Sequence, residues 1–78
     1  MEFKDYLQQK HLLNKSERKL KGISINQYIN RLESMRRNGI YNDEKQIDSI
    51  LERKIQERYG DWKTYARTIE HYLSSKKY

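Results

Sequence analysis

The sequence predicts an all-α fold, a compact bundle of four helices in a single domain of residues 1–78. The chain contains no proline and only three glycines, so it lacks the residues that hairpins and closely spaced strands require. Apolar residues recur at intervals of three and four in four segments, a pattern typical of amphipathic helices. Short links between such helices favour a bundle in which the apolar stripes share one core.

Two helices are predicted in the first half of the chain, at about residues 2–13 and 24–38, with a polar and basic link at 14–22. The side of the first helix predicted to be buried comprises Phe3, Tyr6, Leu7 and then Lys10 or His11. The second helix begins at Ser24, which stands three residues before Gln27 in a capping-box arrangement, and it ends at an Asn-Gly pair. Its apolar stripe comprises Ile25, Tyr28, Ile29, Leu32 and Met35.

The second half of the chain predicts helices at about residues 43–59 and 61–74. Asn42 or Asp43 is expected to cap the third helix, and Asp61 is expected to cap the fourth. The apolar stripe of the third helix comprises Ile47, Ile50, Leu51, Ile55 and Tyr59. The apolar stripe of the fourth comprises Trp62, Tyr65, Ala66, Ile69, Tyr72 and Leu73. We expect all of these to be core positions without a ligand-binding role.

The net charge of +6 is concentrated in one half of the chain. Residues 1–39 hold nine Lys and Arg against four Asp and Glu, whereas residues 40–78 hold eight against seven. A basic excess of this kind favours a polyanionic partner, because binding releases the counterions of the polyanion. The same excess is also typical of small domains whose lysines serve solubility.

Several classes of protein are disfavoured by composition. The chain has no cysteine for disulfides or zinc, its amino terminus lacks the apolar run of a signal peptide, and no stretch has the ~20 apolar residues of a membrane span. We therefore expect a cytoplasmic protein that does not engage membranes. His11 and His71 have no metal-ligand spacing, and the chain has no phosphate-binding glycine loop and no nucleophile motif. The sequence therefore predicts a protein that is not an enzyme and that binds no metal, cofactor or small-molecule substrate.

Basic and polar residues on the predicted outward faces point to DNA. Arg, Lys, Asn and Gln are the side chains that hold phosphates or contact base edges. The second helix presents Gln27, Asn30, Arg31, Ser34 and Arg37 opposite its apolar stripe. The fourth presents Lys63, Thr64, Arg67, Thr68 and His71. The link between the first two helices adds Lys15, Arg18, Lys19 and Lys21. The alternative for each residue is an ordinary solvated helix surface.

Three stretches in this order resemble a known family. Residues 20–35, with Ser24, Tyr28 and Leu32, resemble the second helix of the SAM-like core-binding domain that precedes the catalytic domain of phage-type integrases, the tyrosine recombinases. Residues 62–73 resemble the last helix of that domain, and residues 3–7 its first. The motifs are mainly core positions, and Asn26 departs from the Thr-like residue usual there.

The resemblance implies a SAM-like bundle that clamps one side of a DNA duplex with little sequence specificity. Outward residues of the second and fourth helices would then lie near phosphates, which implicates Arg31, Arg37, Lys63 and Arg67. The integrase catalytic arginines, His-x-x-Arg motif and tyrosine nucleophile belong to a separate domain. Tyr78 does not match that nucleophile, because no Arg–His cluster accompanies it.

Several alternatives stay open. The chain is either part of a longer recombinase or a complete protein of a phage or mobile element that has the binding fold without catalysis. Alternatively, the protein is an adaptor or inhibitor that binds a host or phage protein, since tyrosine and arginine are favoured at protein interfaces. Exposure of Tyr41 or Tyr78, or an apolar patch beside Trp62, would favour that role. A third hypothesis is a helix-turn-helix regulator built from the third and fourth helices.

Overall fold

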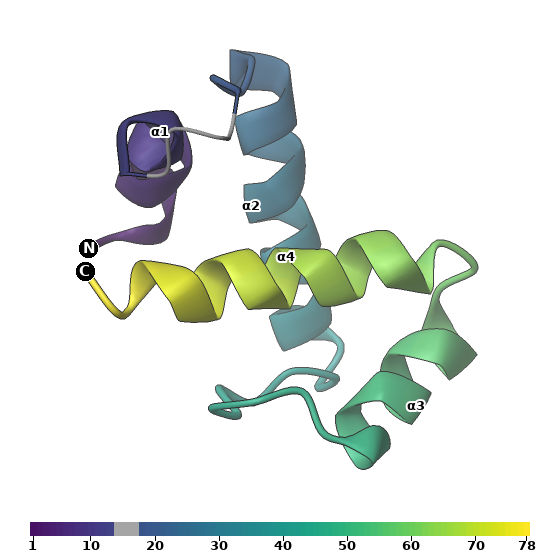
Figure 1. Ribbon diagram of the computed structural model, residues 1–78. Helices are drawn as coiled ribbons and strands as arrows, with labels where there is room; N and C mark the ends of the chain where they lie inside the picture. Colours follow the sequence, from purple (N-terminus) through teal and green to yellow (C-terminus); the bar gives the residue numbers. More distant parts are fainter. Residues whose placement is uncertain (14–17) are drawn as a thin grey trace.

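The computed structural model describes residues 1–13 and 18–78, which form four α-helices and no strand (Figure 1). The helices are α1 (Phe3–Leu13), α2 (Gly22–Arg37), α3 (Ser49–Arg58) and α4 (Trp62–Ser75). The predicted all-α bundle is therefore confirmed. α4 crosses α2 and packs against each of the other helices, with α1 beside its C-terminal end and α3 beside its N-terminal end. α4 is thus the central element of the fold.

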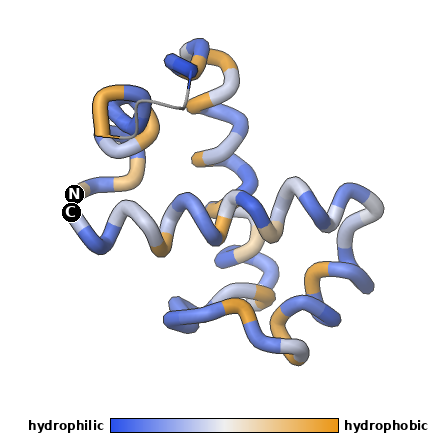
Figure 2. The backbone as a smooth tube through the Cα atoms, in the orientation of Figure 1, coloured by the Kyte–Doolittle hydropathy of each residue, from blue (hydrophilic) through white to orange (hydrophobic). Residues whose placement is uncertain are grey.

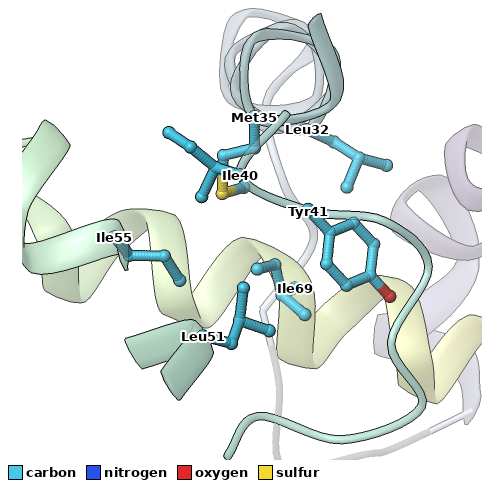
Figure 3. Close-up of a cluster of buried hydrophobic side chains, with 7 residues drawn as sticks. All are labelled: Leu32, Met35, Ile40, Tyr41, Leu51, Ile55 and Ile69. Atoms are coloured by element: carbon cyan, nitrogen blue, oxygen red, sulfur yellow. The ribbon is translucent and has the colours of Figure 1, made fainter. Parts of the chain in front are cut away.

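Two clusters of buried side chains hold the helices together. In Figure 3, Leu32 and Met35 of α2, Leu51 and Ile55 of α3, and Ile69 of α4 meet Ile40 and Tyr41 from the segment after α2. A smaller cluster comprises Tyr6, Leu7 and Ile25 and joins α1 to α2, and Phe3 packs against both. Hydrophilic and hydrophobic residues alternate along every helix in Figure 2, as amphipathic helices require. Each fully buried aliphatic side chain contributes roughly 1.5–3 kcal/mol.

The start of α2 differs from the prediction. The helix begins at Gly22, and the extended residue before it, Lys21, makes no side-chain capping bond. The amide of Ile25 already donates to the carbonyl oxygen of Lys21 at 3.1 Å, so Ser24 lies inside the first turn. The predicted capping box of Ser24 and Gln27 is therefore wrong. The predicted C-terminal end at Asn38 and Gly39 is confirmed, and Gly39 has the positive φ of 70° expected there.

The start of α3 also differs. Helix α3 begins at Ser49, six residues after the predicted start, and its cap is Asp48, whose carboxylate accepts a hydrogen bond from the amide of Leu51 at 2.8 Å. The preceding segment is held by Tyr41, which is 1% exposed and donates its hydroxyl to the carbonyl oxygen of Glu44 at 2.8 Å. Asp43 adopts a left-handed φ of 61° there and does not cap a helix.

This late start changes the apolar stripe predicted for the third helix. Ile47 packs against the core as predicted, but it does so from the loop before α3 and not from a helix. Ile50 is 70% exposed, so its assignment to the core is wrong. Leu51 and Ile55 are buried as predicted. The stripe is therefore correct at Leu51 and Ile55, whereas Ile50 lies within α3 but faces solvent.

Helix α4 lies within one residue of its predicted bounds. Asp61 occupies the N-cap position, but its carboxylate accepts from the hydroxyl of Thr64 at 2.8 Å and makes no capping bond to a backbone amide. The N-terminal amine donates to the backbone oxygen of Tyr78 at 3.0 Å, so the two ends of the chain lie side by side (Figure 1). Among the described residues, none of the helices has the length and apolarity needed to cross a membrane.

Candidate nucleic-acid interface

The crossing of α2 and α4 brings two predicted DNA-binding arginines to the same side of the protein. The rings of Tyr28 on α2 and His71 on α4 meet edge to face, with centroids 5.1 Å apart and planes at 75°. The guanidinium carbon of Arg31 lies 5.7 Å from the centroid of the Tyr28 ring. Arg67 precedes His71 by four residues and therefore lies on the same side of α4. Arg31 and Arg67 consequently flank one crossing point.

A second contact brings the end of α3 to this region. The Tyr59 hydroxyl lies 3.0 Å from the hydroxyl of Ser34 on α2, and its ring stacks on Tyr65 of α4 with centroids 3.7 Å apart and planes at 9°. The guanidinium carbon of Arg58 is 5.2 Å from the centroid of the Tyr59 ring. Arg58 is thereby placed near α2 and α4 through the Tyr59 ring.

We call this region the crossing face. It comprises Gln27, Arg31, Arg58, Lys63, Thr64 and Arg67. The arginines of the crossing face form no ion pair with the described residues. Within residues 1–13 and 18–78, the arginine that does so is Arg36, which pairs with Asp43 at 2.9 Å. The carboxylate of Asp61 accepts a hydrogen bond from the Thr64 hydroxyl of this face. Binding an anion here therefore requires no arginine ion pair to be broken.

The ring contacts of the crossing face orient its cations. A guanidinium over an aromatic ring is attracted by the negative face of the ring, and the contact restricts its side-chain rotamers. Arg31 is held in this way at the Tyr28 ring and Arg58 at the Tyr59 ring, while the ammonium of Lys63 lies 5.8 Å from the Trp62 ring. Less conformational entropy is then lost when these side chains bind a phosphate.

The predicted residues of α2 divide between two sides of the helix. Gln27 is exposed and Arg31 half-buried, and their spacing of four places both on the side of the crossing. Asn30 and Arg37 are exposed; Asn30 is rotated about 60° around the helix from Gln27, whereas Arg37, six residues after Arg31, is rotated about 120° from it. The structure therefore does not bring all four together. Ser34 is half-buried and bonded to Tyr59, which corrects its expected exposure.

The predicted outward face of α4 is narrower than expected. Lys63 and Arg67 are exposed, and Thr64 is half-buried. Thr68 is fully buried and donates to the carbonyl oxygen of Thr64 at 2.9 Å, so its predicted outward orientation is wrong. His71 is half-buried against Tyr28. His71 is covered by Tyr28 of α2, a contact that helical spacing alone cannot reveal.

Three of the four link residues lie in the described part of the chain. Arg18, Lys19 and Lys21 are exposed in the segment that leads into α2. Lys15 lies outside the described residues. The three described cations extend the basic surface along the chain from the N-terminal end of α2.

The described residues hold no set of three or more acidic or histidine side chains arranged for a metal ion. The crossing face offers guanidinium and ammonium groups, an amide and a hydroxyl, which are the donors that hold phosphate oxygens. Its chemistry is therefore that of anion recognition.

The chain matches no protein-family model, no curated protein and no solved structure. The resemblance to the integrase core-binding domain thus stands on the residues that carry it, and it remains a prediction.

Proposed function

We propose that the protein is a non-catalytic DNA-binding module, similar to an integrase core-binding domain, which contacts duplex phosphates through α2 and α4. The observation that carries this proposal is the convergence of Arg31 and Arg67 at the Tyr28–His71 contact. Arginine and lysine contacts to phosphates do not depend on base identity, so binding is expected to be tolerant of sequence.

The geometry supports backbone contact better than a helix inserted in a groove. α4 packs against α1, α2 and α3, and its residues Thr68 and Ile69 are fully buried. A recognition helix of a helix-turn-helix protein must present a free face to the base edges. The narrow exposed strip of α4 around Lys63 and Arg67 is suited to a phosphate chain along its length.

Fluorescence polarisation with a labelled random-sequence duplex tests this proposal. The affinity should fall steeply as salt rises, because each neutralised phosphate contributes a slope of about −0.9 in log affinity against log salt. Absence of binding at low salt would refute a role in DNA binding.

A second candidate is an adaptor or inhibitor that binds a host or phage protein. Its support is the exposure of large apolar side chains on three helices: Leu12 is 70% exposed, Ile23 67% and Ile50 70%. Tyr78 is 58% exposed, whereas Tyr41 is buried and offers no such surface. Recovery of one stoichiometric protein after nuclease treatment, together with absent duplex binding, would favour this function.

A further inference from the structure

A polar cleft lies between α1 and the C-terminal half of α4, beside the crossing face. Its volume is about 400 Å³. Its lining includes Tyr6, Lys10, His71, Ser74, Lys77 and Tyr78. The Tyr6 and Tyr78 rings stack with centroids 5.8 Å apart and planes at 26°. Because that contact joins α1 to the end of the chain, the cleft is formed by parts of the protein that already pack together.

The lining of the cleft suits a phosphate group. Lys10 and Lys77 supply ammonium donors, His71 supplies a ring N–H in either protonation state, and Ser74 supplies a hydroxyl. Among the described residues of the lining, Glu70 supplies a carboxylate, and the cationic and neutral donors outnumber it. Lys10 and His71 each also interact within the protein, so a phosphate would share these groups with their present partners.

Burial of Lys10 strengthens the case for an anion. Lys10 is only 6% exposed, and it lies about one turn after Tyr6 and Leu7 on the buried side of α1. Most of the dehydration of this side chain therefore accompanies folding and does not recur when a ligand binds. Attraction between opposite charges is also stronger in a partly buried site than at an open surface. Lys10 thus provides a positioned charge, in contrast to the exposed Lys77 at the mouth of the cleft.

The cleft continues the crossing face along α4. His71 lines the cleft and contacts Tyr28, whose ring also lies near Arg31. From Arg67 to its last residue, Ser75, α4 spans about 12 Å of helix axis, which corresponds to roughly three to four base-pair steps of a duplex. We infer that the cleft binds one phosphate of a DNA strand lying along α4, an inference that rests on the proposed function.

The test uses Lys77→Gln, with Lys76→Gln as its matched control. The two changes remove the same charge from neighbouring residues, but the Lys76 ammonium lies 4.7 Å from the Tyr72 ring and does not line the cleft. In the duplex salt titration, Lys77→Gln should reduce the slope by about 1, the share of one phosphate, while Lys76→Gln leaves it unchanged. Equal slopes for Lys77→Gln and the parent would overturn the inference.

Inorganic phosphate provides a probe that is independent of DNA. Titration followed by amide NMR shifts should give a saturable response at Lys10, His71 and Lys77, lost in the Lys10→Met and Lys77→Gln double variant. Lys10→Met keeps the buried aliphatic part of the side chain, and thermal unfolding shows whether the double variant folds. If the double variant does not fold, Lys77→Gln alone serves as the test. Absence of a response in the parent would overturn the site.

A phosphate response in the parent, together with a duplex salt slope that Lys77→Gln leaves unchanged, would show a site for free anions only and overturn its role in DNA binding. If the parent binds no duplex, the proposed function fails, and the phosphate titration alone decides the cleft.

Discussion

Tyr28 and His71 join α2 to α4 through an edge-to-face contact with ring centroids 5.1 Å apart. The contact lies between the crossing face and the polar cleft, because Arg31 lies near the Tyr28 ring and His71 lines the cleft. Edge-to-face pairs are favourable since the positive edge of one ring meets the negative face of the other. The relative positions of the two proposed phosphate contacts therefore depend on this pair.

Tyr28→Ala should weaken duplex binding as well as stability. The change removes the ring against which Arg31 and His71 rest, and the loss of a half-buried aromatic side chain costs about 1–3 kcal/mol in the free energy of unfolding. Thermal unfolding and fluorescence polarisation measure the two effects. Tyr28→Phe keeps the ring and should resemble the parent in both. Duplex affinity of Tyr28→Ala equal to that of the parent would show that Arg31 needs no support from this ring.

Asp48→Ala should destabilise the protein by about 1 kcal/mol. Its carboxylate accepts from the Leu51 amide at 2.8 Å, and loss of such a cap leaves an amide at the start of α3 without its partner. Ser24→Ala is the comparison, because Ser24 lies within α2 and its replacement should change the free energy of unfolding by less than about 0.5 kcal/mol. Urea denaturation distinguishes the two variants. A larger loss for Ser24→Ala would restore the capping box predicted from the sequence.

Stability should fall between about pH 10 and pH 12 because of Tyr41. Burial raises the pKa of Tyr41 to about 12, with the nearby carboxylate of Asp43 adding to the shift. The neutral hydroxyl is therefore favoured by folding: its contribution is complete below the unfolded pKa of about 10 and is lost as pH rises through the folded pKa.

Tyr41→Phe isolates this contribution from those of the other six tyrosines. The variant lacks the hydrogen bond to the Glu44 carbonyl and should lose about 1 kcal/mol at neutral pH. Its further loss from pH 10 to pH 12 should be smaller than that of the parent, as measured by urea denaturation at each pH. Parallel stability curves for the two proteins would rule out Tyr41 as the source.

The fold could be predicted from the sequence wherever apolar periodicity coincides with a real helix. The stripes of α1 and α4 are regular, and both helices lie within one residue of their predicted bounds. The segment before α3 could not be predicted in this way. Ile47 has helical spacing relative to Ile50 and Leu51, but it lies in a loop that is held by burial of Tyr41 and its bond to Glu44, a tertiary effect.

For the candidate site, the sequence could predict the exposure of single residues but not which residues lie together. Helical spacing indicated that Gln27, Lys63 and Arg67 would be exposed, and they are. It could not indicate that Thr68 would be buried, or that Tyr59 brings Arg58 to the same face. These relationships depend on the angle between packed helices, and no local pattern encodes it.

The most direct test of the central claim is duplex binding across a salt titration by the double variant Arg31→Glu and Arg67→Glu. The control is Arg53→Glu paired with Lys45→Glu, which changes the charge equally at exposed positions outside the crossing face. The account predicts that the first variant loses affinity strongly and has a shallower salt slope, while its thermal unfolding stays close to that of the parent. The control should retain most of the affinity and the parent's slope. Equal losses in the two variants would contradict the crossing face as the site of DNA contact.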